Sequence, residues 1–329
     1  MTSMRLAYST DLGKLYHGDA VEWLESQAND SADVIVADPP YGANNTVHWD
    51  RFGSLDDYVK WSETWLTEAA RVLKPEGSLF VCGYAENLAY LKVFGDRHFA
   101  GCRWLVWYYR NKHAPWKSDW GRAHEGVLHF RHSKRFKFRQ DAVRTPYNAH
   151  TLRYPEHPQA RSSALGSKKT RETGHIWQPH PLGAKPKDVF DISTLNNGMA
   201  ERTSHPTQKP EDLIRRLVLA CSDRGDLVLD PFGGSGTTYV VAEKLERQWR
   251  GVEQDASYIE MAIARLAAVE PDEVRYLGEY RAMSEASDSN RELVRAGRNG
   301  KRGTAGNGRS AMSEDHGPQI FEQQVLEGP

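Results

Sequence analysis

The segment 227–253 constrains the fold of this chain more than any other stretch of its sequence. An apolar run leads into a glycine-rich turn at 230–238, and a helical segment and a second apolar run that ends in Glu253 follow. This order predicts a strand, a tight turn, a helix and a parallel strand joined by a right-handed crossover. Glycine lets such a turn approach a ligand closely, and the next helix offers free amides. The third glycine of a dinucleotide fingerprint would fall at position 239, which is Tyr239, so the turn suits a nucleoside better than NAD.

A second predicted strand end carries an acid. The run 33–37 is short, apolar and rich in β-branched residues, which predicts a buried parallel strand. Asp38-Pro39-Pro40-Tyr41 follows directly, and its prolines end the strand because they cannot donate a ladder hydrogen bond. The motif alone fits a simple strand-ending turn equally well. As a functional motif it would lie at the carboxyl edge of the sheet, next to the glycine turn, where open α/β folds bind ligands.

The composition fits a cytoplasmic α/β enzyme. The chain has 329 residues, of which 39% are apolar and 26% charged, and these values are typical of soluble globular proteins. No apolar run reaches the length of a membrane-spanning helix, so we expect no membrane association. Cys82, Cys102 and Cys221 are widely spaced. They form neither a disulfide framework nor a zinc pattern, which favours a reducing compartment and no bound metal.

Positive charge is concentrated in the middle of the chain. The net charge is −1, yet the segment 103–187 carries 18 Lys and Arg against five Asp and Glu. Aromatic residues lie between these charges, and cations beside aromatic rings suit phosphates and stacked bases. The alternative is a solvated surface without a partner. From 133 to 184 proline residues interrupt every regular pattern, which predicts a recognition insertion that orders partly on binding nucleic acid.

Together these motifs resemble the amino-group DNA methyltransferases that use S-adenosylmethionine, in their β arrangement. In that arrangement the Asp-Pro-Pro-Tyr motif precedes the target-recognition region, and the glycine motif comes last. The resemblance extends over 15–266 apart from the insertion. The matching elements, in chain order, are Gly18-Asp19, Asp38 to Tyr41, the turns 71–77 and 205–210, Asp230 to Thr238, and 251–253.

The resemblance implies a role for each matching residue. Asp38, Pro39, Pro40 and Tyr41 would be the catalytic motif, with Asp38 touching both substrate and cofactor. The other residues implied in binding S-adenosylmethionine are Asp19 at the adenine, Glu253 at the ribose, Thr207 and Lys209 at the methionine carboxylate, and Phe232, Gly233, Gly234, Ser235 and Gly236 around the methionine and ribose. A helix-capping role explains Asp19 equally well.

The expected architecture is a mostly parallel, doubly wound, Rossmann-like methyltransferase sheet with a basic insertion and a disordered C-terminal tail. The expected regions are 1–110, the catalytic half; 111–186, the target-recognition insertion; 187–280, the cofactor-binding half; and 281–329, the tail. A strand near 126–130 is a candidate for the core even though it falls inside the insertion.

The expected function is methyl transfer to the N6 amine of a flipped-out adenine in double-stranded DNA. Asp at the first motif position resembles adenine-N6 enzymes, whereas cytosine-N4 enzymes more often show Ser there. Cytosine-N4 methylation remains an alternative, as does a non-catalytic nucleic-acid-binding protein of the same fold. Methylation at cytosine C5 needs an attacking thiolate, which the enzymes of that family present in a Pro-Cys pair. No cysteine of this chain follows a proline, so this reaction is excluded. A homodimer and a cognate restriction endonuclease are compatible partners.

Overall fold

The computed structural model describes residues 4–42, 50–112, 120–154, 157–160 and 172–269. All of them belong to the first of the two units into which the chain divides, residues 1–287. The expected disordered tail (281–329) lies outside the described residues. No helix in the described ranges is long and apolar enough to cross a membrane.

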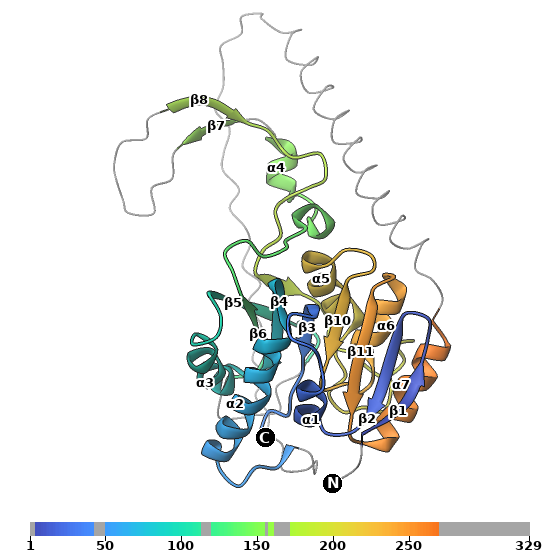
Figure 1. The fold of residues 1–329 in the computed structure, drawn as a ribbon. Coiled ribbons are helices and arrows are strands. Elements are labelled where there is room, and N and C mark those ends of the chain that lie inside the picture. The colour runs from blue at the N-terminus through green and yellow to red at the C-terminus, as the bar shows by residue number, and fades with distance from the viewer. Residues whose placement is uncertain (1–3, 43–49, 113–119, 155–156, 161–171, 270–329) are drawn as a thin grey trace, which may run out of the picture. The chain divides into compact units, whose positions relative to one another are not determined.

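A nine-stranded sheet forms the centre of the described protein (Figure 1). Its strands, from one edge to the other, are β1 (Arg5–Ser9), β2 (Gly13–His17), β11 (Gln248–Glu253), β10 (Leu227–Asp230), β3 (Ala32–Ala37), β4 (Leu73–Gly83), β6 (His124–Arg131), β5 (Gly101–Tyr108) and β9 (Val189–Asp191). Five of the eight strand pairings are parallel, which confirms the predicted mostly parallel sheet. The antiparallel edge strand β1 was not predicted, because its short polar sequence shows no clear alternation.

Helices cover both faces of this sheet, so the predicted doubly wound architecture is confirmed. In β3, Val34 and Val36 pack into one core, whereas Ile35 and Ala37 pack into the other, as the alternation of side chains in a strand requires. The first core is completed by α5 (Glu211–Cys221), α6 (Thr237–Lys244) and α7 (Ala256–Ala267). The second is completed by α1 (Ala20–Glu25), α2 (Leu55–Val72) and α3 (Ala85–Gly95).

The long helix α2 begins at a capping signal that is visible in its sequence, Ser54 followed three residues later by Asp57. The Ser54 hydroxyl accepts a hydrogen bond from the Asp57 amide and donates one to the Asp57 carboxylate, which is a reciprocal cap. At the other end Arg71 donates to the carbonyl oxygens of Leu24 and Gln27, both at 2.9 Å. Leu24 lies in the last turn of α1 and Gln27 just beyond its end, where carbonyl oxygens have no partner within the helix ladder. Arg71 therefore fixes α2 against α1 on one face of the sheet.

The segment after β6 contains some regular structure, which the sequence did not predict. The described parts comprise a 3₁₀ turn (Gln140–Val143), α4 (Ala149–Arg153), and the two-stranded sheet of β7 (His157–Ala160) and β8 (Glu172–Trp177). Residues 155–156 and 161–171 of the expected insertion lie outside the described residues. Two of its basic side chains bind the core: Lys137 pairs with Asp226, and Arg139 donates to Asp223 at 2.8 and 2.5 Å. These two cations hold the segment to the core, which leaves them less available for phosphate.

His129 on β6 links stability to pH. The side chain is only 6% exposed, its Nε2 lies 3.0 Å from the Ser78 hydroxyl, and its ring stacks on Phe80. Burial, and then the positive charges of Arg131 and Arg103, lower the pKa of His129 to about 3. An unfolded histidine titrates near 6.5, so on acidification the unfolded chain takes up this proton first. The contribution of His129 to the free energy of unfolding is fully present above about pH 6.5 and is lost as the pH falls towards 3.

We therefore expect His129→Gln to weaken the pH dependence of unfolding. Between pH 7 and pH 5 the wild-type protein should lose about 2 kcal/mol of stability through His129 alone, and the variant should lack this part of the loss. Urea denaturation at the two pH values measures the difference. An equal loss in both proteins would show that His129 does not carry the effect.

Candidate active site

The candidate site lies at the carboxyl ends of neighbouring parallel strands. From β10 the chain continues to β11 on one side, whereas β3, its neighbour on the other side, leads to β4, so the strand order reverses between β10 and β3. Ligands of open α/β sheets bind at such a switch point. A cavity of about 280 Å³ opens there. Every site residue expected from the sequence lines it except Gly236.

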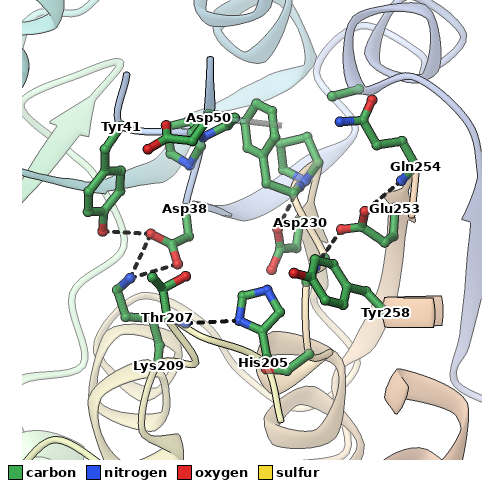
Figure 2. Close-up of a pocket in the computed structure, with 18 of the residues that line it drawn as sticks. Asp38, Tyr41, Asp50, His205, Thr207, Lys209, Asp230, Glu253, Gln254 and Tyr258 are labelled. Atoms are coloured by element: carbon green, nitrogen blue, oxygen red, sulfur yellow. Dashed lines mark hydrogen bonds and ion pairs between the residues drawn. The ribbon is translucent and has the colours of Figure 1, made fainter. Parts of the chain in front are cut away.

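Asp38 follows β3 and lies at one end of the cavity. Its Oδ1 accepts hydrogen bonds from the Tyr41 hydroxyl at 2.8 Å and from the Lys209 ammonium at 2.9 Å. Its Oδ2 accepts a second bond from Lys209 at 2.7 Å, as Figure 2 shows. A carboxylate oxygen has two acceptor positions, so these bonds occupy Oδ1 and leave one position at Oδ2. That position can accept an N–H from a substrate amine.

Lys209 is positioned by the turn before α5. Its side chain is buried, and its backbone carbonyl accepts a bond from the Thr237 hydroxyl at 3.1 Å, which ties this turn to the glycine turn. Burial alone would lower the pKa of Lys209, but the carboxylates of Asp38 and Glu125 outweigh it and raise the pKa above its usual value. The ammonium is therefore charged. Its bonds are to the Asp38 carboxylate, whereas the resemblance implied a contact with the methionine carboxylate of the cofactor.

The glycine turn follows β10 and needs its glycines for two physical reasons. Gly234 has a φ of 49°, in the left-handed region, and a Cβ there would lie 3.1 Å from the His205 ring. Gly236 has a φ of 76° and begins α6. It shapes the turn from behind, which explains why it does not line the cavity. The Phe232 amide bonds to Asp230 at 2.9 Å and closes the start of the turn.

Glu253 ends β11 and closes the far side of the cavity from Asp38 (Figure 2). Its Oε2 accepts a bond from the Gly234 amide at 2.7 Å, and its Oε1 accepts from the amides of Gln254 and Asp255. Burial raises the pKa of this carboxyl, and these backbone bonds oppose the rise. Two carboxylate oxygens have about four acceptor positions, so one remains at Oε2.

Asp19 and Thr207 complete the set expected from the sequence. Asp19 caps α1 by accepting from the amides of Val21 and Glu22, which confirms the capping role, and it also lines the cavity. Thr207 is exposed at the rim, and its amide donates to His205 at 3.3 Å. Burial, the largest influence, lowers the pKa of His205 to about 4, so its ring is neutral near pH 7.

Several residues near the site were not predicted from the sequence. The lining residues among them are Trp61, Tyr84, Asp50, His205 and Tyr258. Glu125 on β6 bonds to Tyr41 at 3.2 Å without lining the cavity. Arg265 on α7 reaches the glycine turn from behind. Only His205 belongs to a matching element, the turn 205–210; no motif marks the others, because contacts between distant parts of the chain bring them to the site.

Arg265 supports the glycine turn and yields a prediction. Its guanidinium donates to the Ser235 carbonyl and to the Thr237 hydroxyl, both at 2.9 Å, and to Glu211 at 2.8 Å. Loss of these bonds should loosen the turn, so we expect Arg265→Ala to weaken binding of the S-adenosyl cofactor that the sequence implies about tenfold. Isothermal titration with S-adenosylhomocysteine measures this effect. Arg216→Ala removes an exposed arginine of α5 and is the matched control. Equal affinities of both variants would contradict the supporting role.

The chain's own residues fit an adenosyl cofactor. Figure 2 shows carboxylates at both ends of one cavity, Glu253 at one end and Asp38 at the other. Between them the glycine turn packs so closely on Tyr239 and His205 that a Cβ at Gly233 or Gly234 would crowd these side chains. No group of three or more potential metal ligands occurs in the described part of the chain. Fold and cavity define the class: a doubly wound α/β protein with a nucleoside pocket at its switch point.

Comparisons with known proteins agree with this class. The family model for N6/N4-type DNA methylases matches residues 32–264. The type II methyltransferase M.BglII of Bacillus subtilis is 33% identical over 272 residues, which cover 80% of this chain and 71% of that protein. The DNA adenine methyltransferase YhdJ of Escherichia coli (strain K12) is 30% identical over 270 residues, which cover 79% and 84%.

Solved structures show the same fold. The cytosine-N4-specific PvuII DNA methyltransferase has a TM-score of 0.60 at 21% identity, with coverage of 85% of this chain and 95% of that one. The M1.HpyAVI–SAM complex has a TM-score of 0.50 at 22% identity, with coverage of 77% and 98%.

This chain belongs to the N6/N4 DNA methylase family: it is a site-specific DNA methyltransferase that transfers a methyl group to an exocyclic amine. Its methyl donor is S-adenosylmethionine. The family and the cofactor expected from the sequence are thereby confirmed.

Proposed function

We propose that the protein methylates the N6 amine of adenine in double-stranded DNA, with Asp38 as the catalytic acceptor. One observation carries this proposal: Asp38, with an open Oδ2 position, shares a cavity with Glu253 and the glycine turn. The choice of adenine is supported by Asp at the first motif position and by the similarity to an adenine methyltransferase.

The proposed chemistry follows from the positions of the acceptors. The bound cofactor supplies an electrophilic methyl group on a positively charged sulfur. An exocyclic amine is a poor nucleophile because its lone pair is delocalised into the ring. Asp38 Oδ2 accepts one N–H and the Pro39 carbonyl accepts the other, so the nitrogen becomes more tetrahedral and its lone pair points at the methyl group. Positioning and electrostatics then provide most of the rate enhancement.

The remaining residues have proposed binding roles. Tyr41 stacks on the flipped base, which offsets part of the few kcal/mol needed to take a base out of the duplex. Glu253 accepts the ribose hydroxyls, Asp19 faces the adenine, and Thr207 faces the methionine carboxylate. The cofactor is wrapped by Phe232, Gly233, Gly234 and Ser235, whereas Gly236 and Lys209 act by shaping the turn and holding Asp38.

Cytosine-N4 methylation is the second candidate. It is supported by the similarity of the fold to a cytosine-N4-specific enzyme, and an Asp38 carboxylate could hold either amine. The cytoplasm is the proposed compartment because the three cysteines are free thiols, as a reducing environment requires. A partner restriction endonuclease is proposed because the relatives are named type II methyltransferases. A homodimer is proposed from the family resemblance of the sequence.

The experiment that tests this function uses unmethylated genomic DNA. The purified full-length chain is incubated with isotopically labelled S-adenosylmethionine, and the nucleosides are separated by mass spectrometry. Labelled N6-methyladenine is the expected product. Labelled N4-methylcytosine would keep the mechanism and overturn the choice of base. A protein that binds the cofactor and leaves DNA unlabelled would overturn the proposed function.

A further inference from the structure

We infer that Glu125 is a positioning residue of the reaction centre, which acts through Lys209 and Tyr41. The Lys209 ammonium neutralises the Asp38 carboxylate, and Glu125 restores a net negative charge. The inference rests on the proposed function and deepens it. The sequence does not identify this residue, and it contacts the reacting groups only through its neighbours.

The topology of the sheet brings Glu125 to the site. β6 runs antiparallel to β4, with Gly126 opposite Gly83, so its first residues lie at the edge where β3 ends. Glu125 is 8% exposed. A carboxylate at such depth is costly unless it has partners. Those that the structure gives it belong to the site: the Tyr41 hydroxyl at 3.2 Å and the Lys209 ammonium at 3.7 Å from Oε2.

The geometry makes Glu125 and Asp38 two ends of one arrangement. The Tyr41 hydroxyl lies 2.8 Å from Asp38 and 3.2 Å from Glu125, so it bridges the two carboxylates. The Lys209 ammonium lies between the same two groups and also faces the Tyr41 ring, 5.1 Å from its centroid. Glu125 therefore helps to hold the lysine and the tyrosine against Asp38, whose Oδ2 keeps one acceptor position after its bond to Lys209.

Charge explains why a second carboxylate is needed. Asp38 and Lys209 alone form a neutral pair, and Glu125 gives the cluster a net charge of −1. In the transfer, the amine lone pair forms the new N–C bond and the electrons of the S–C bond stay with sulfur. Positive charge thus moves from sulfur to the amine nitrogen, which later releases a proton. A net negative cluster attracts the charge at both positions, whereas a neutral pair does so weakly.

The effect of this negative charge can be measured by ligand binding, without methyl transfer. S-adenosylmethionine carries a positive sulfur, whereas S-adenosylhomocysteine has a neutral one and lacks the methyl group. We expect Glu125→Gln to reduce the preference for the charged ligand, measured as the ratio of the two dissociation constants, by about threefold to tenfold. If Glu125 had a purely structural role, Glu125→Gln would weaken the binding of both ligands equally. Glu125→Asp keeps the charge and should keep most of the preference.

The matched control is Glu86→Gln. Glu86 lies on α3, is exposed and pairs with Arg122. Glu86→Gln therefore changes the net charge of the protein by the same amount as Glu125→Gln, but away from Asp38 and Lys209. This variant should keep the wild-type ratio. In single-turnover transfer to DNA, Glu125→Gln should be slower by about 10- to 100-fold, and Glu125→Asp should recover part of the rate. Thermal unfolding of each variant is measured in parallel.

The outcomes separate this inference from the proposed function. An unchanged ratio of dissociation constants in Glu125→Gln, or an equal change in Glu86→Gln, overturns the role of Glu125 even if the wild-type protein methylates DNA. A wild-type protein that does not methylate DNA overturns the proposed function, and the ratio still decides whether Glu125 supplies the charge.

Discussion

Replacing Asp38 with asparagine is expected to slow methyl transfer to DNA by at least about 10³-fold while the protein stays folded. The carboxylate accepts from Tyr41 and Lys209, and in the proposed mechanism its remaining position accepts from the amine. An asparagine has only one acceptor oxygen, and its NH₂ group would face either the lysine or the amine, both of which are donors. The fold should survive because Glu125 remains 3.7 Å from the buried Lys209 as a counter-charge.

The measurement is single-turnover transfer at saturating cofactor and DNA, with cofactor binding and thermal unfolding measured on the same samples. Asp212→Asn is the matched control, since Asp212 is an exposed carboxylate of α5 that forms an ion pair with Arg216, one helical turn further along. Its rate should equal that of the wild-type protein. Substantial transfer by Asp38→Asn would remove Asp38 from the catalytic role.

Replacing Glu253 with alanine is expected to weaken cofactor binding by about 100-fold, because a bond from a hydroxyl to a carboxylate contributes about 1.5–3 kcal/mol. The same change also removes the acceptor of the Gly234 amide, which would disturb the glycine turn. A loss of affinity alone therefore does not separate a ribose contact from a change in the turn.

A double-mutant cycle with the ligand separates the two effects. Wild-type and Glu253→Ala proteins are titrated with S-adenosylhomocysteine and with its 2′-deoxy analogue. If Glu253 holds the ribose, the wild-type protein should discriminate strongly between the ligands and the variant should not. If both proteins discriminate equally between the two ligands, Glu253 does not contact the ribose and only supports the glycine turn.

The sequence predicted those parts of the fold that depend on neighbouring residues. Ser54 and Asp57 mark the start of α2, the prolines after Asp38 mark the end of β3, and the glycine turn marks the end of β10. Each signal is local, since a cap, a missing amide or a left-handed φ depends on a few residues. The parallel, doubly wound sheet follows from the order of these signals.

What the sequence did not predict depends on distant contacts. Glu125 stands in an ordinary strand, and only the antiparallel return of β6 brings it next to Tyr41. The bond between Lys209 and Asp38 joins residues 171 positions apart. The ion pairs of Lys137 and Arg139 with Asp226 and Asp223 show that positive charge in a sequence can serve packing as well as phosphate binding. Local patterns carry no information about such pairs.

The pairing of β3 with β10 has a consequence for the synthesis of the protein. Val34 lies opposite Val228, so the two central strands come from opposite ends of the catalytic unit. On the ribosome the first acid of the site emerges long before the glycine turn, and the centre of the sheet cannot close until the later strand is made. Pairings over such a separation also form slowly. Chains that terminate early would lack both the central strand and the cofactor pocket, so only a full catalytic unit can modify DNA.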